Sequence, residues 1–241
     1  MHYLKFGSSK IFIVFLHGWG ADLNSFLWLK DLFVDDYSLI FLDFPGFGIS
    51  GVPQNSMCVS DYVFDLKKLL DEFEIDELTF VAHSFGGRVA IKFLFYYQGI
   101  YKKVKLCLVD SAGILPRRNL IYKLKVAKFK RLKKKAETNS CVRERLNDYG
   151  SSDYKVLCPI MKQTFVRVVN EDLSEYAKFL NCKTIIVWGQ KDKETKLYMA
   201  RVLHKLIRDS KLFILKGVGH FSFIEKKEEF AIILDTFMKN L

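Results

Sequence analysis

The sequence predicts an α/β fold in which a mostly parallel central sheet is flanked by helices and interrupted by a helical insertion. Short apolar runs alternate with segments of helical period up to about residue 112, and this alternation resumes after residue 182. Between these two parts the chain carries helical periods only. Its 241 residues, 50% of them hydrophobic, suffice for one substantial core. We therefore expect residues 1–112 and 182–241 to form that core, and residues 113–181 to be inserted into it.

Six apolar runs are expected to form the strands. They are Ile11–Leu16, Leu39–Leu42, Leu78–Val81, Val104–Val109, Thr184–Gly189 and Lys211–Leu215. Between and after them, apolar residues recur at offsets of three, four and seven, which places them on one face of a helix. Three helices of the core are expected to have such a face. The first consists of Tyr62, Leu66, Leu69, Leu70 and Phe73, the second of Val89, Ala90, Phe93, Leu94 and Tyr97, and the third of Phe230, Leu234, Phe237, Met238 and Leu241. The insertion has two shorter faces, Met161, Phe165, Val168 and Val169, then Leu173, Tyr176, Ala177 and Leu180.

The glycines of "DFPGFGISG" have the G-x-G-x-x-G spacing of a dinucleotide site. Such a site requires the glycines to open a helix whose N-terminus receives the pyrophosphate. Here "VPQNSM" follows Gly51, and the next helical period begins only near Ser60. We interpret the stretch as a glycine-rich turn after a strand, and we expect no cofactor.

The net charge of +11 is concentrated in one segment of the insertion. Residues 117–135 contain ten Lys or Arg and no Asp or Glu, which leaves +1 for the rest of the chain. Three interpretations stay open: the solvated outer face of a helix, weak contact with an anionic membrane, or attraction of an acidic substrate. Nucleic-acid binding is not expected, because no recognised module accompanies the charge.

The five cysteines are odd in number and widely spaced, without C-x-x-C or a Cys/His cluster. We expect free thiols and no metal site. No apolar stretch approaches the length of a membrane span, and "IFIVFL" is too short for the apolar part of a secretory signal. The sequence therefore predicts a cytoplasmic protein.

Ser84 lies in "TFVAHSFGG", between an apolar strand and an amphipathic helix, with Ala82, Gly86 and Gly87 around it. Small neighbours permit a sharp strand-to-helix turn that exposes a nucleophile. The turn also directs the helix N-terminus, with its free N–H groups, toward a developing oxyanion. The alternative is a turn rich in small residues for packing alone, because Ala82 stands where the G-x-S-x-G motif has its first glycine.

A serine nucleophile needs a base and a group that orients the base. His220 lies on a Gly-flanked loop just after a strand, where the sites of open α/β sheets gather. Asp192, in "WGQKD", has the matching position after the preceding strand, and Asp110, which ends "KLCLVD", is the alternative acid. The other histidines are expected at a frayed terminus, in structural roles or pointing away from the serine: His2, His17, His83 and His204.

Six motifs of the chain resemble those of the α/β-hydrolase family, in the family's order and over nearly the whole length. They are "HGWG", "DFPGFGIS", "AHSFGG", "LVDSAG", "WGQKD" and "GVGHF". The resemblance implies the α/β-hydrolase fold, with the insertion as a helical cap over the active site. It implies Ser84 as nucleophile, His220 as general base and acid, and Asp192 as the residue that orients His220. It also implies an oxyanion hole formed by the backbone N–H groups of Trp19 and Phe85.

The activity expected from this resemblance is that of a serine esterase, which cleaves a small-molecule carboxylic ester or related acyl substrate through an acyl-enzyme. Hydrolysis of a C–C bond, hydrolysis of a lactone and perhydrolysis on the same three residues stay open as alternatives. An alternative of another class is a non-catalytic protein that binds a ligand or a membrane surface. An intact Ser, His and Asp set argues against that class, because a binder needs neither a base nor a group that orients it.

Overall fold

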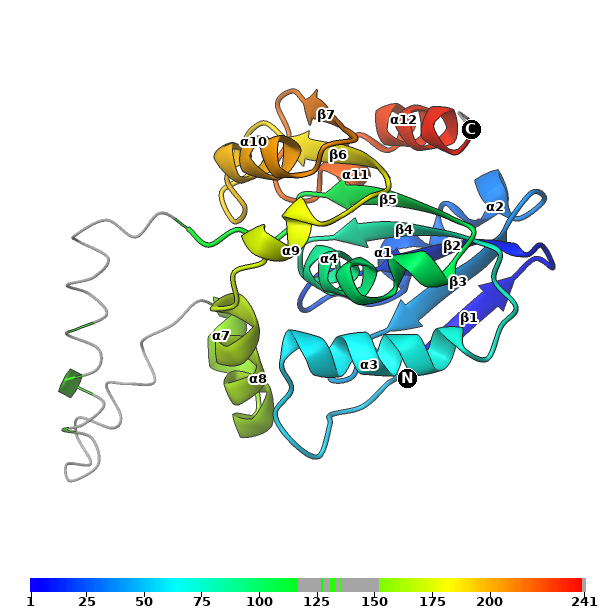
Figure 1. Cartoon of the computed structure of the whole chain (residues 1–241). Helices are drawn as coiled ribbons and strands as arrows, with labels where there is room; N and C mark the ends of the chain where they lie inside the picture. The colour runs from blue at the N-terminus through cyan, green and yellow to red at the C-terminus, as the bar shows by residue number, and fades with distance from the viewer. Residues whose placement is uncertain (117–126, 128–130, 133–134, 136–151, 240–241) are drawn as a thin grey trace.

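The computed structural model describes residues 1–116, 127, 131–132, 135 and 152–239 (Figure 1). Its centre is a seven-stranded sheet in the order β1-β3-β2-β4-β5-β6-β7. Neighbouring strands are parallel, except that β1 is antiparallel to β3. The strands are β1 (His2–Phe6), β2 (Ile11–Leu16), β3 (Ser38–Asp43), β4 (Glu77–His83), β5 (Lys103–Val109), β6 (Lys183–Gly189) and β7 (Ser210–Leu215). The predicted α/β fold is confirmed, and all six predicted strands form.

The first strand, β1, is not among those predicted. It pairs only with β3, from His2 opposite Asp43 to Phe6 opposite Leu39, and its side chains are half-buried or exposed. An edge strand with half-buried side chains lacks the continuous apolar run that marks the buried strands. The expectation of a frayed terminus at His2 is wrong as well, because its Nδ1 lies 2.9 Å from Oδ2 of Asp43.

Two apolar clusters cover the two faces of the sheet. Alternate residues of one strand divide between them: Val14 of β2 belongs to the first cluster and Phe15 to the second. Because both faces are covered, the strands are unbroken apolar runs in the sequence. The first cluster includes α3 (Val59–Leu70), α4 (Phe85–Tyr97) and α10 (Leu197–Leu206). The second includes α1 (Asn24–Leu27), α2 (Lys30–Phe33), α11 (Ser222–Glu225) and α12 (Lys227–Lys239). A short 3-10 helix, η1 (Gln98–Ile100), follows α4.

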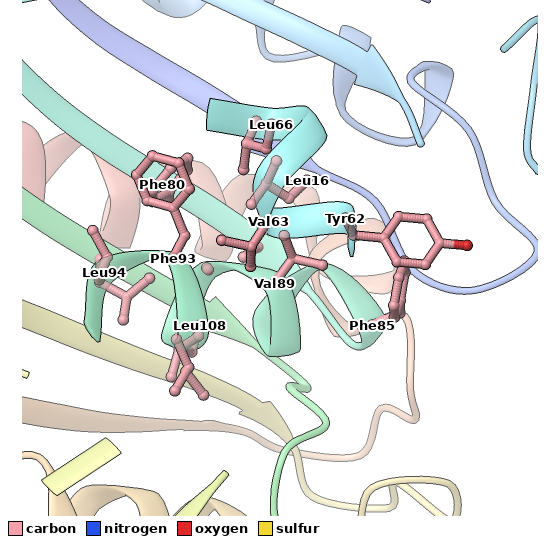
Figure 2. Packing of buried hydrophobic residues seen from close by; sticks show 14 of the residues in the cluster. Leu16, Tyr62, Val63, Leu66, Phe80, Phe85, Val89, Phe93, Leu94 and Leu108 are labelled. Carbon is pink, nitrogen blue, oxygen red and sulfur yellow. The ribbon is translucent and has the colours of Figure 1, made fainter. Parts of the chain in front are cut away.

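Aromatic side chains fix α4 against α3 and the sheet (Figure 2). The rings of Phe80 and Phe93 meet edge to face at 5.1 Å, and those of Tyr62 and Phe85 at 4.9 Å. Phe85 is the residue directly after Ser84, and its side chain is buried in this cluster. The start of α4 is therefore held in place by the core.

Residues 152–181 of the predicted insertion contain three helices and no strand. They are α7 (Ser152–Val156), α8 (Pro159–Val169) and α9 (Ser174–Lys178). The backbone N–H of Met57 donates to Oγ1 of Thr164 at 3.0 Å, which attaches α8 to the loop before α3. The basic segment 117–135 lies outside the described residues, apart from 127, 131–132 and 135. No helix in the described ranges combines the length and the apolar character that a membrane crossing requires.

Replacing Gly86 by alanine is expected to destabilise the protein by about 3 kcal/mol, although alanine favours helices. A Cβ at Gly86 would overlap the backbone carbonyl of Leu16 in β2, and neither main chain can move without disturbing the sheet. Urea denaturation measures the loss. Gly99→Ala is the matched control, because a Cβ there meets nothing within 4 Å and should leave the free energy of unfolding nearly unchanged. Equal stability of the two variants would contradict the tight contact.

Candidate active site

Ser84 lies at a strained turn between β4 and α4. Its φ is 47° and its ψ is −107°, a conformation that a non-glycine residue adopts only when its surroundings enforce it. The backbone N–H of Ser84 donates to the carbonyl of Val109 at 3.0 Å, and its carbonyl accepts from the N–H of Ala112 at 3.0 Å. A Cβ at Gly87 would overlap Oγ of Ser111, so small residues are needed here, as predicted. Ser84 is partly exposed, whereas the residues directly before and after it, His83 and Phe85, are buried.

The structure brings Ser84, His220 and Asp192 into one line of hydrogen bonds. Nε2 of His220 lies 3.0 Å from Oγ of Ser84, and Nδ1 of the same ring lies 2.8 Å from Oδ2 of Asp192. The carboxylate accepts only, so Nδ1 carries the proton and Nε2 is free to accept the serine proton. The three residues follow the carboxyl ends of β4, β6 and β7, which lie on the same side of the sheet because these strands are parallel.

The hydrogen bond between Asp192 and His220 shifts the pKa of both residues. Burial acts to raise the pKa of Asp192, but hydrogen bonds from His220 and Thr195 outweigh it and lower the pKa. Burial acts to lower the pKa of His220, but the hydrogen bond to Asp192 and its charge outweigh it and raise the pKa above the ordinary 6.5. Asp192 is therefore ionised at neutral pH, and the imidazole is a stronger base than usual.

Asp110, the alternative acid, bonds to the loops around the site but not to His220. Its Oδ1 accepts from the N–H of Gly189 at 2.7 Å, and its Oδ2 accepts from the hydroxyl of Ser222 at 2.6 Å. Burial raises its pKa to about 7, so this carboxyl is only partly ionised at neutral pH. The geometry favours Asp192 as the residue beside the base, and gives Asp110 the task of tying β6 to the loop that carries His220.

Thr195 is a residue of the candidate site that the sequence does not predict. Its Oγ1 lies 2.7 Å from Oδ2 of Asp192, 2.9 Å from the carbonyl oxygen of Asp110 and 3.3 Å from Nδ1 of His220. Its N–H also donates to Oδ1 of Asp192 at 3.0 Å. A threonine three residues after the acid gives no signal of its own in the sequence, because the contacts depend on the turn of the loop.

The remaining histidines have other partners. Buried His17 accepts the N–H of Phe44 at Nε2, at 3.0 Å, and His204 contacts Oγ of Ser210, so both have structural contacts. His83 donates from Nε2 to the carbonyl of His220 at 2.8 Å, and its Nδ1 is buried without a partner in the described part of the chain. Burial lowers the pKa of His83 to about 3, so the ring is neutral and holds the His220 loop.

A pocket of about 610 Å³ opens over Ser84 and His220. Its walls are largely apolar and come from the core and from α8: Trp19, Ile114, Phe165, Val168, Val169 and Met199. The rings of Trp19 and Phe165 meet at 5.1 Å, which joins the "HGWG" loop to α8. Such a pocket suits a small, mainly apolar molecule.

Trp19 and Phe85 both line this pocket beside Ser84. Phe85 is the first residue of α4, where N–H groups have no acceptor within the helix. Gly18, which precedes Trp19, lies so close to the nucleophile turn that a Cβ there would be 3.3 Å from Cβ of Ser84. Among the described residues, no group of three His, Cys, Asp or Glu is arranged to hold a metal ion.

Comparisons with known proteins agree with this architecture. Residues 11–116 match the family model described as alpha/beta hydrolase fold. The hydrolase YugF of Bacillus subtilis is 24% identical, over 99% of this chain and 93% of its own. An esterase from Exiguobacterium antarcticum superposes with a TM-score of 0.77 at 22% identity, covering 99% of this chain and 95% of its own.

A meta-cleavage product hydrolase of Pseudomonas fluorescens, CumD, superposes with a TM-score of 0.72 at 20% identity, covering 98% of this chain and 93% of its own. At such identities, the two solved structures show a shared fold. The match to the family model, the superposed structures and the seven-stranded sheet together show that the chain has the alpha/beta-hydrolase fold.

Proposed function

We propose that the protein is a serine hydrolase that cleaves a carboxylic ester through an acyl-enzyme. The observation that carries the proposal is the line of hydrogen bonds from Ser84 through His220 to Asp192, at the floor of a pocket with apolar walls. A binding protein has no need of a strained serine, a base and an ionised acid in one line. The esterase that shares this fold supports the choice of ester as substrate.

In the proposed reaction every proton has a donor and an acceptor. Oγ of Ser84 attacks the ester carbonyl while its proton passes to Nε2 of His220, 3.0 Å away. When the tetrahedral intermediate collapses, His220 gives this proton to the leaving alkoxide, which departs as an alcohol. Water then attacks the acyl-enzyme and loses its proton to the same nitrogen, and the acid leaves as Ser84 regains its hydrogen. Asp192 stabilises the imidazolium in both halves of the reaction.

In this proposal the oxyanion lies against the backbone N–H groups of Phe85 and Trp19. The first belongs to the N-terminus of α4, whose positive dipole end favours an anion. The second follows Gly18, which packs against the nucleophile turn. Such donors cost no reorganisation when negative charge develops.

Labelling with a fluorophosphonate probe tests the proposal directly. We expect covalent modification of Ser84, located by peptide mass spectrometry, and hydrolysis of members of a panel of esters and lactones. His220→Ala should abolish labelling, because the hydroxyl then lacks its base. Failure of the wild type to label, together with no turnover of any panel member, would favour the non-catalytic alternative.

The activity is expected to fall as the pH is lowered through the pKa of His220. The neutral imidazole accepts the serine proton, and its raised pKa means that protonation begins at a higher pH than for an ordinary histidine. The dependence of kcat/KM on pH for an uncharged ester measures this. Incubation at each pH followed by assay at neutral pH controls for unfolding. A rate that increases toward acid pH would contradict the role of His220.

A further inference from the structure

Arg88 is a charged residue of the pocket that the reaction described above does not use. It lies on α4, four residues after Ser84, so that its Cα is displaced by about 6 Å along the helix axis. The residue is only 5% exposed, yet it lines the same pocket as Ser84 and His220. A buried arginine beside a catalytic serine needs an explanation, because arginine is rarely buried unless it is paired.

The protein partners of the guanidinium are neutral. Nη1 donates to the carbonyl of Glu171 at 2.7 Å, and Nη2 makes a long contact of 3.5 Å with the carbonyl of Val169, at the end of α8. No carboxylate in the described ranges forms an ion pair with Arg88. A guanidinium has five N–H donors, so donors remain for a ligand.

Two acids, Glu171 and Asp172, lie close enough that their charges act to raise the pKa of Arg88, but both carboxylates have other hydrogen-bond partners. The carboxylate of Glu171 pairs with Lys92, and that of Asp172 accepts from the N–H and the hydroxyl of Ser174, at 2.9 and 2.6 Å. Burial lowers the pKa of Arg88 to about 10, so the group still carries its charge at neutral pH. The pocket wall therefore contains a cation that forms no ion pair in the described part of the protein, although the nearby charges of Glu171 and Asp172 partly oppose the effect of burial on its pKa.

The surroundings of Arg88 in the pocket are apolar. Val168, Val169 and Ile114 line the same space, and Glu194, an acid of the lining, is exposed to solvent. In such surroundings a charged hydrogen bond is stronger than in water, and it discriminates sharply against molecules that lack the partner. An uncharged ester in the pocket would cover the guanidinium of Arg88 without pairing with it.

We propose that the natural substrate carries a carboxylate, remote from the scissile ester, which pairs with Arg88 when the ester carbonyl lies over Ser84. The inference rests on the proposed esterase function and narrows it to anionic esters such as half-esters of dicarboxylic acids. Arginine suits this task because its planar fork matches a carboxylate in two parallel hydrogen bonds. The apolar walls hold the chain between the two ends of such a substrate.

A purely structural role for Arg88 predicts a different result, and Lys92 provides the control. Lys92 lies one turn further along α4, is buried, and pairs with Glu171, so it attaches the same segment after α8. It is not part of the pocket lining. If Arg88 served only to anchor that segment, Lys92→Met and Arg88→Met would have the same effect on every substrate.

The test compares monomethyl glutarate with methyl hexanoate, an uncharged ester of similar length, on the wild type, Arg88→Met, Arg88→Lys and Lys92→Met. We expect Arg88→Met to lower the ratio of kcat/KM for the charged over the uncharged ester by about 10- to 100-fold. Arg88→Lys should keep part of the preference, and Lys92→Met should leave the ratio unchanged. A ratio that Arg88→Met does not alter, or that Lys92→Met lowers equally, overturns the inference while the esterase function stands.

A binding experiment separates this inference from the proposed function. Calorimetry with glutarate on Ser84→Ala, with and without Arg88→Met or Arg88→Lys, needs no turnover. Binding that depends on the charge at residue 88 supports the anion site, even if no ester is hydrolysed and Ser84 fails to label. Absence of glutarate binding to Ser84→Ala, combined with equal turnover of the two esters by the wild type, contradicts it.

Discussion

Ser84→Ala is expected to lower kcat for an activated ester by about four to six orders of magnitude. The variant removes the atom that attacks the carbonyl in the proposed reaction, while the pocket and the N-terminus of α4 remain. Pre-steady-state kinetics on the wild type should show a burst of alcohol release as the acyl-enzyme accumulates, and the variant should show none.

The structural control for Ser84→Ala is its thermal denaturation. Alanine at this position keeps the strained φ of 47° and loses only the contact with Nε2 of His220, so Tm should change little. Activity within about tenfold of the wild type in a folded variant would exclude the nucleophile assignment, because the residual catalysis expected without a nucleophile is far lower.

Asp192→Asn is expected to cost about four orders of magnitude in kcat. Its amide would present a donor or a neutral acceptor to Nδ1 of His220, so the ring would lose the tautomer that leaves Nε2 free for the serine proton. Thr195 and the backbone N–H of Glu194 would still hold the side chain in place, so the loss should appear in kcat more than in stability. Steady-state kinetics with one activated ester gives the comparison.

Asp110→Asn is the matched control, because it makes the same change on the neighbouring buried carboxyl. The NH2 group of the new amide would face either the N–H of Gly189 or the hydroxyl of Ser222, both of which donate to Asp110 in the wild type. The variant should therefore lose about 1–3 kcal/mol of stability while keeping most of its kcat. The reverse result, with activity lost in Asp110→Asn and retained in Asp192→Asn, would assign the acid to Asp110.

The parts of the fold that the sequence predicted are those with strong local signals. The buried strands are continuous apolar runs, and β2 has the same bounds, Ile11–Leu16, in the prediction and in the structure. Short stretches of sequence predict Ser84 from its position between a strand and a helix, and His220 from its position after a strand and by elimination among the five histidines. The glycine-rich stretch is predicted to be a turn, and Asp43 in it accepts hydrogen bonds from the N–H groups of Leu23 and Ile49, which joins two loops near the "HGWG" motif.

What the sequence did not predict depends on contacts between distant segments. β1 forms because it can pair with the outer side of β3. Thr195 contacts Asp192 only because the loop between them turns back on itself. Arg88 resembles any charged residue on a helix until the segment after α8 covers it, 83 residues later in the chain. Choosing between Asp192 and Asp110 likewise requires knowing which carboxylate contacts Nδ1 of His220.

The pairing of β5 with β6 has a consequence for how the protein folds. The chain leaves the sheet at Val109 and returns at Lys183, so this pairing must close a loop of about 70 residues. Ser84 lies before that loop, and His220 and Asp192 lie after it. Loops of this length are slow to close, because the entropy of closure is lost before the pairing of the strands can offset it. In a refolding experiment, reactivity toward a fluorophosphonate should therefore appear after most of the helical circular dichroism signal has returned. Labelling of Ser84 would then report when β5 pairs with β6.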